Sequence, residues 1–179
     1  SEENRAQDAV IAYNFEQDMS QQNIKALGTI WFTKTDMMAF ILQVDCAKTS
    51  WTKREILSTY SKLFDIHGAI SPVIIQARMI MQQTYKLDQK YDSDDKLPEQ
   101  ITKDWLKWLE ELKHLPEIMI PRSLEPLDRI VVKKEVHIFA DASSQAMAAV
   151  AYMRNILDDN TVDIRLIRSV AHVTPVKFL

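Results

Sequence analysis

Asp141 is the residue of this sequence whose position most strongly suggests chemistry. It ends a stretch, residues 136–141, in which apolar side chains alternate with others, a pattern typical of a β-strand. The carboxylate therefore shares one face of the predicted strand with Phe139 and lies beside the loop at residues 142–144. An aspartate at a strand end can bind a metal ion, but such residues more often form turns or cap helices. Spacing alone leaves both interpretations open.

The composition excludes several other kinds of site. Two glycines in 179 residues argue against a glycine-rich phosphate loop, and the single cysteine, Cys46, forms neither an internal disulfide nor a thiolate metal centre. An aspartic peptidase needs Asp-Thr-Gly or Asp-Ser-Gly to present its paired carboxylates. The nearest triplets, residues 92–94 and 141–143, lack the glycine, so the residues do not support aspartic peptidase activity.

Basic residues are concentrated in one part of the chain. The net charge of −3 does not indicate a nucleic-acid-binding protein, but residues 51–91 contain six basic and three acidic residues. The six are Lys53, Arg54, Lys62, Arg78, Lys86 and Lys90. A basic face on the helices predicted here would bind phosphates, and a solvated helix face explains the same pattern equally well.

Three helices are predicted between residues 53 and 115. Thr52 and Glu55 have the spacing of a capping box, which predicts a helix over residues 53–64. Ser71 is the predicted N-cap of a second helix, which has Pro72 at its first position and extends to about residue 91. The third helix has apolar residues spaced 4, 3, 4 and 3, which predicts a buried face of Ile101, Trp105, Trp108, Leu112 and Leu115.

The remaining segments predict mainly β-structure. Residues 26–43 contain two runs of β-forming residues around a polar turn, which predicts a hairpin. Residues 135–141, 146–152 and 162–170 predict three strands of an antiparallel meander. The apolar residues Ile11, Phe15 and Met19 are spaced by four, which predicts a helix there from a weaker pattern. The predicted fold class is therefore α+β.

These segments resemble a known family in the order in which they occur. Residues 136–143 and 146–152 are similar to the opening of the ribonuclease H domain in BEL/Pao-type retrotransposon polyproteins, a family filed as Pao retrotransposon peptidase. Upstream, the resemblance to the segment after the reverse transcriptase palm is carried by residues 52–58 and 64–72, then by Trp105, Trp108, Leu109 and residues 118–122. Residues 27–31 and 35–36 resemble the hairpin that closes the palm. The resemblance covers about residues 25–179.

The resemblance implies a palm-closing β-hairpin, a helical thumb or connection, and then the first antiparallel strands of a ribonuclease H-like fold. Residues 1–50 would be the C-terminal end of the palm, residues 51–116 the thumb or connection, and residues 117–179 a truncated N-terminal part of the ribonuclease H-like domain. The polymerase motif Tyr-x-Asp-Asp is not matched. Residues 91–95 contain one residue too many and follow a helix, which predicts a solvated acidic loop.

By the same resemblance, Asp141 is the first of the catalytic, metal-binding carboxylates of ribonuclease H. Such carboxylates together hold two Mg²⁺ or Mn²⁺ ions roughly 3.5–4 Å apart. One carboxylate cannot hold two divalent ions, and the resemblance places the others beyond Leu179. We therefore expect the complete parent to bind the metal, and this fragment alone neither to bind it tightly nor to hydrolyse RNA.

The resemblance also implies a function and partners. The parent would copy RNA into DNA and hydrolyse the RNA strand, in the cytoplasm or in virus-like particles, with no membrane involved. The fragment would bind an RNA/DNA hybrid or template–primer duplex through its basic residues and would contact the remainder of the Pol polyprotein. The alternative is a non-enzymatic protein-interaction module from a decayed or domesticated retroelement, in which the helix of Trp105 and Trp108 packs on a partner. Spacing favours core packing for both tryptophans.

Overall fold

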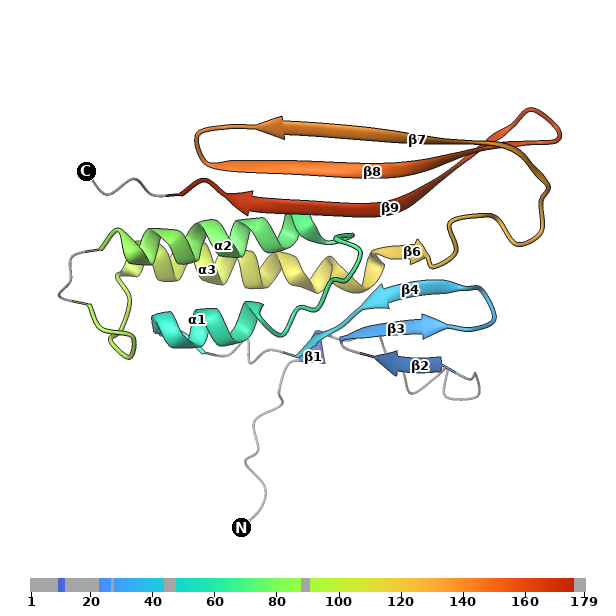
Figure 1. Cartoon of the computed structure of the whole chain (residues 1–179). Coiled ribbons are helices and arrows are strands. Elements are labelled where there is room, and N and C mark those ends of the chain that lie inside the picture. Colours follow the sequence, from blue (N-terminus) through green and yellow to red (C-terminus); the bar gives the residue numbers. More distant parts are fainter. Residues whose placement is uncertain (1–9, 12–22, 27, 44–47, 88–90, 176–179) are drawn as a thin grey trace, which may run out of the picture.

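A computed structural model describes residues 10–11, 23–26, 28–43, 48–87 and 91–175. The helices are α1 (Lys53–Tyr60), α2 (Ser71–Tyr85) and α3 (Glu99–Glu111), and α3 continues into the 3₁₀ helix η2 (Leu112–Glu117). The strands are β1 (Val10–Ile11), β2 (Asn23–Ala26), β3 (Thr29–Phe32), β4 (Met37–Phe40), β5 (Leu42–Gln43), β6 (Met119–Pro121), β7 (Val131–Ala142), β8 (Ala146–Leu157) and β9 (Val162–Val173). They form the antiparallel sheets β1-β5, β2-β3-β4-β6 and β7-β8-β9 (Figure 1). The predicted α+β class is confirmed.

The three helices share one hydrophobic core, and the apolar stripe of α3 lies at its centre. Trp105 is fully buried and stacks on Trp108, with 4.6 Å between the ring centroids, while Trp51 contacts Trp105 edge-on. The indole N–H of Trp108 donates to the carbonyl of Val73 on α2, at 2.9 Å. Core packing of both tryptophans is thus confirmed. None of the described helices has the length and apolar character that a membrane crossing needs.

The first two helix predictions were right about existence and partly wrong about boundaries. Thr52 and Glu55 form the predicted capping box, but α1 ends at Tyr60 and not near residue 64. The prediction that Ser71 caps α2 was wrong, because Ile70 occupies the cap position without a side-chain hydrogen bond. The carboxylate of Asp65 accepts instead from the backbone N–H groups of Ala69 and Ile70, both at 2.8 Å.

The second helix is also shorter than predicted. It ends at Tyr85 and not near residue 91, and Leu87 packs against the helical core just beyond its last turn. Lys53 then draws the chain back toward α1, because its ammonium group donates to the carbonyl of Tyr91 at 2.8 Å.

The N-terminal sheet contains the predicted hairpin, formed by β3 and β4, with β2 added on one side and β6 on the other. Asp36, at a positive φ of 53° in the hairpin turn, accepts hydrogen bonds from Trp31 and Arg122. Burial raises the pKa of Asp36, but these two hydrogen bonds, together with the charge of Arg122, hold it below its usual range. The helix predicted from Ile11 to Met19 was wrong at its start, because Ile11 lies in β1, and residues 12–22 lie outside the described part.

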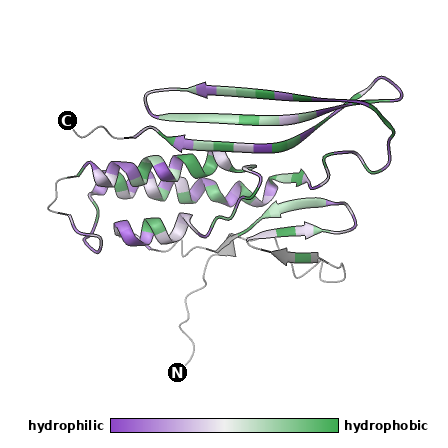
Figure 2. Ribbon diagram, in the orientation of Figure 1, coloured by the Kyte–Doolittle hydropathy of each residue, from purple (hydrophilic) through white to green (hydrophobic). Residues whose placement is uncertain are grey.

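The C-terminal sheet is the predicted antiparallel meander, with strands several residues longer than the sequence pattern indicated. Asp141 is paired with Ala148 of β8, and Ala148 is paired in turn with Ala171 of β9, so the three residues form one row across the sheet. Hydrophobic and hydrophilic residues alternate along β7 and β9 (Figure 2). Many apolar side chains of this sheet are exposed, among them Val136, Ile138 and Phe139.

The sheet meets the helices through the outer edge of β9, which lies along α2 (Figure 1). The N–H of Ser169 donates to the carbonyl of His67 at 2.8 Å. Arg78 donates to the carbonyl of Ala171 at 2.9 Å, and Gln82 donates to the carbonyl of Thr174 at 2.6 Å. The contact therefore satisfies backbone groups that an open sheet edge leaves unpaired.

A Gly68→Ala substitution tests this contact. Gly68 has φ +76°, and a Cβ atom there would lie 1.8 Å from the carbonyl oxygen of Ser169, so the loop and β9 must separate. We expect the free energy of unfolding, measured in urea, to fall by more than about 2 kcal/mol. The control is Gly28→Ala, which has the same φ but no Cβ contact shorter than 3.4 Å, and should cost only about 1 kcal/mol. Equal losses in the two variants would contradict the close contact at Gly68.

Candidate functional site

Asp141 lies one residue before the end of β7, on the face of the sheet that turns toward the start of α2. One of its carboxylate oxygens accepts the N–H of Ala142 at 2.9 Å, and the side chain is exposed. The same face carries Phe139 and Tyr152, whose rings meet edge-on with 6.3 Å between centroids. Asp141 and Phe139 therefore share one face near the end of a strand, as the sequence pattern predicted.

A groove separates this face of the sheet from the beginning of α2. Its volume is about 340 Å³, and Gly68, Ala69 and Pro72 line one wall while Phe139, Asp141 and Tyr152 line the other. A neighbouring hollow of about 360 Å³ continues along α2 and is lined by Ser71, Gln76, Asp141 and Ala171 among others. Asp141 thus lies where a bound molecule would contact both the sheet and α2.

Asp141 is not joined by other metal-binding side chains in the part of the chain that the structure describes. Within the described ranges no three His, Cys, Asp or Glu side chains gather closely enough to hold an ion. Glu135 is on the same strand, but Lys133, His137 and Arg154 bind its carboxylate and lower its pKa to about 2. The carboxylate of Glu135 is therefore already paired with cations, one of which, Arg154, lies on β8.

The six predicted nucleic-acid-binding residues do not have equivalent environments. Lys53 and Arg78 donate to backbone carbonyls, of Tyr91 and Ala171 respectively. Lys62 and Lys86 are exposed, with no ion pair to a described residue. Lys90 lies outside the described residues.

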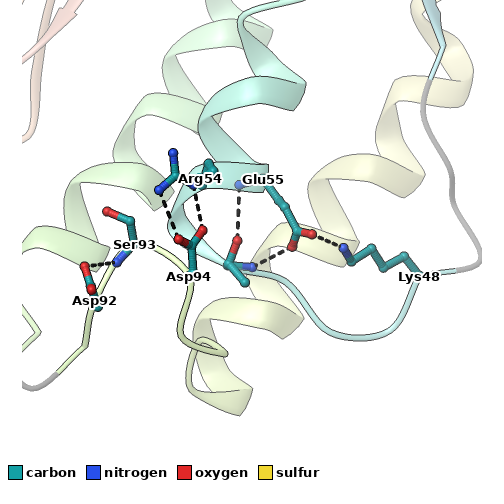
Figure 3. A network of polar contacts seen from close by, with 7 residues as sticks. Lys48, Arg54, Glu55, Asp92, Ser93 and Asp94 are labelled. Carbon is teal, nitrogen blue, oxygen red and sulfur yellow. Dashed lines mark hydrogen bonds and ion pairs between the residues drawn. The ribbon is translucent and has the colours of Figure 1, made fainter.

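Arg54, the remaining member, is bound to the acidic loop. Its guanidinium contacts both carboxylate oxygens of Asp94, at 2.6 and 3.0 Å, and the N–H of Arg54 donates to the carbonyl of Ser93 (Figure 3). Asp92 and Asp95 bond to backbone N–H groups within the loop. Residues 91–95 therefore form a solvent-exposed acidic loop that holds the start of α1, as the residue count and the preceding helix predicted.

Arg168 is a charged residue near this site that sequence reasoning missed. It is exposed on β9 and lines a small pocket together with Arg78 of α2. The alternation of residues 162–170 assigns Arg168 to one face of a strand, but no pattern in the sequence indicates that this strand lies beside α2.

An α+β chain with an aspartate near the end of the first strand of an antiparallel meander fits the ribonuclease H-like class. Comparison with protein families supports this directly: residues 52–178 match the Pao retrotransposon-like RNaseH-like domain. The chain therefore belongs to that family, which confirms the resemblance to Pao retrotransposon proteins. No curated protein and no solved structure matches the chain significantly.

The Arg54–Asp94 pair gives a prediction about protonation. The hydrogen bond and the charge of Arg54 lower the pKa of Asp94, so the pair adds stability above the ordinary aspartate pKa and loses it as the pH falls through the lowered value. In an Arg54→Gln variant we expect the Asp94 pKa to rise to its ordinary range, as measured by NMR titration of the carboxyl carbon. The resonance of Asp159, whose pKa is lowered by hydrogen bonds from Thr161 and Arg129, serves as the internal control, and an unchanged Asp94 pKa would contradict the pairing.

Proposed function

We propose that the chain forms part of a retroelement Pol polyprotein, in which it binds an RNA/DNA hybrid or template–primer duplex and contributes Asp141 to the hydrolysis of the RNA strand. The observation that carries this proposal is the place of Asp141 near the end of β7, in a groove against α2, within the matched ribonuclease H-like region. A carboxylate in an open groove is accessible to a phosphodiester backbone and to hydrated metal ions.

The N-terminal elements fit the same assignment. The hairpin of β3 and β4 would be the one that closes a reverse transcriptase palm, and α1 to α3 would be the thumb or connection that follows it. In that arrangement the helices contact the duplex through phosphates, which positions the nucleic acid without selecting its sequence. Lys62 and Lys86, exposed and unpaired among the described residues, are the best-placed members of the basic set.

The metal of this chemistry would be Mg²⁺ or Mn²⁺, for which carboxylate oxygens are suitable ligands. One oxygen of Asp141 accepts the N–H of Ala142, and a carboxylate with a single hydrogen bond keeps lone pairs that can bind a metal. A two-ion centre needs several converging carboxylates, and the described residues provide only Asp141 at this place. The residues present therefore do not fit the complete centre, and the proposal assigns the other ligands to residues outside the described part.

A non-enzymatic interaction module is the second candidate, supported by a different surface from the one first expected. The helix of Trp105 and Trp108 is not free to bind a partner, because both side chains are buried in the core of the chain itself. The exposed Val136 and Ile138, 58% and 71% accessible, instead favour the C-terminal sheet as a surface for protein contact.

Hybrid binding is the first experimental test of the proposed function. At about 0.1 M salt we expect fluorescence anisotropy to give a dissociation constant in the micromolar range or weaker, with strong salt dependence. Replacing Lys62 and Lys86 together by Gln should weaken binding and reduce the salt slope by about two. The control replaces Lys103 and Lys107 of α3 by Gln, which removes the same charge elsewhere. Equal effects of the two double variants, or no binding at low salt, would contradict the proposal.

Asp141 is tested separately by weak metal binding. Mn²⁺ at millimolar concentration should broaden the NMR signals of the Ala142 and Ala148 amides, because both lie beside the Asp141 carboxylate. The broadening should disappear in Asp141→Asn and persist in Asp159→Asn, whose carboxylate lies in the β8–β9 turn and pairs with Arg129. The chain alone should not cleave the hybrid. Broadening that survives Asp141→Asn would remove Asp141 from the proposed metal site.

A further inference from the structure

Two arginines differ from the others in the part of the chain that the structure describes. That part contains seven arginines: Arg54, Arg78, Arg122, Arg129, Arg154, Arg165 and Arg168. Five of the seven form ion pairs with described carboxylates: Arg54 with Asp94, Arg122 with Asp36, Arg129 with Asp159, Arg154 with Glu135, and Arg165 with Asp163. The two left over, Arg78 and Arg168, line the same pocket, although they are 90 positions apart in the sequence.

This pocket, the α2–β9 pocket, has a volume of about 160 Å³ and lies between α2 and the outer edge of β9. Ser71, Arg78, Arg168 and His172 contribute polar groups to its lining. Arg78 is half-buried and is held in place by the hydrogen bond from its Nη1 to the carbonyl of Ala171. Because a guanidinium group has five N–H donors, this bond leaves most of them available to a ligand.

One carboxylate, that of Asp65, also lines the pocket. Its two oxygens accept the N–H groups of Ala69 and Ile70, so its hydrogen-bonding capacity is directed to the backbone before α2 and not to the arginines. The pocket therefore contains two guanidinium groups without a carboxylate partner among the described residues. Two such cations at one small site repel each other, and an anion that binds both relieves this repulsion.

We propose that the α2–β9 pocket binds a phosphate group of the nucleic-acid backbone, with Arg78 and Arg168 as its cationic ligands. The inference rests on the proposed function for the origin of the phosphate. Phosphate oxygens match the bidentate geometry of a guanidinium, as carboxylate oxygens also do, and the nucleic-acid backbone of the proposed function supplies phosphate. Ser71, Ser169 and Ala171 line both this pocket and the hollow that contains Asp141, so the two places adjoin at the contact between α2 and β9.

The experiment compares Arg168→Gln with Arg129→Gln. Arg168 is exposed, and its side chain forms no ion pair with another described residue, whereas Arg129 is an exposed arginine whose charge is already paired with Asp159. For Arg168→Gln we expect about tenfold weaker binding of an RNA/DNA hybrid and a salt slope reduced by about one. Arg129→Gln should change affinity less than twofold. Urea unfolding of both variants verifies that they remain folded.

A second measurement separates this inference from the proposed function. Inorganic phosphate is titrated while the amide NMR signals of Ser71 and Ser169 are followed, and both should shift in the unmodified chain but not in Arg168→Gln. Hybrid binding unaffected by Arg168→Gln would overturn the inference and leave the proposed function standing. Phosphate shifts that require Arg168, without any hybrid binding, would support an anion pocket that takes free phosphate and would overturn the proposed function. If the chain shows no hybrid binding and no phosphate shifts, the inference and the proposed function are both overturned.

Discussion

The seating of the β9 edge on α2 is the contact on which the geometry of the candidate site depends. Asp141, Ala148 and Ala171 form one row across the C-terminal sheet, and the carbonyl of Ala171 accepts a hydrogen bond from Arg78 of α2. The position of the carboxylate relative to the helices is therefore set through two strand pairings and the hydrogen bonds that join the β9 edge to α2 and to the loop before it. The close approach at Gly68 allows this seating, because any side chain there would meet the backbone of Ser169.

This arrangement treats the two edges of the C-terminal sheet differently. The C-terminal half of the β9 edge is covered by the loop before α2 and by the side chains of Arg78 and Gln82, which bond the N–H of Ser169 and the carbonyls of Ala171 and Thr174. The apolar residues Val136 and Ile138 of β7, at the other edge, stay accessible. Accessible apolar side chains such as Val136 and Ile138 thus lie on β7, the strand farthest from α2 in this sheet (Figure 1), and the charged pocket lies at the junction with α2.

The sequence predicted those features that depend on local periodicity. The spacing of Trp105 and Trp108 required a buried helix face, the pair Thr52 and Glu55 required a helix start, and alternation before Asp141 required a strand. Each of these signals is contained within a few residues and does not depend on the rest of the fold. The resemblance carried by the same segments was enough to place the chain in its family.

The features that sequence reasoning missed depend on contacts between distant segments. Asp65, and not Ser71, accepts the backbone hydrogen bonds before α2. Asp94 forms an ion pair with Arg54, which lies 40 positions earlier in the sequence. Arg168 approaches Arg78 only because β9 lies along α2. Whether the chain divides into domains at residues 50/51 and 116/117 stays a prediction, as do the roles of Asp141 and of the basic residues.

Hydrogen exchange at the Ser169 amide tests the central claim most directly, because this N–H donates across the junction to the carbonyl of His67. If β9 is seated on α2, the Ser169 amide exchanges slowly, as slowly as amides paired between β8 and β9. Exchange as fast as that of amides at the outer edge of β7 would mean that the sheet is not seated on α2, and the geometry derived for both the groove of Asp141 and the α2–β9 pocket would be wrong.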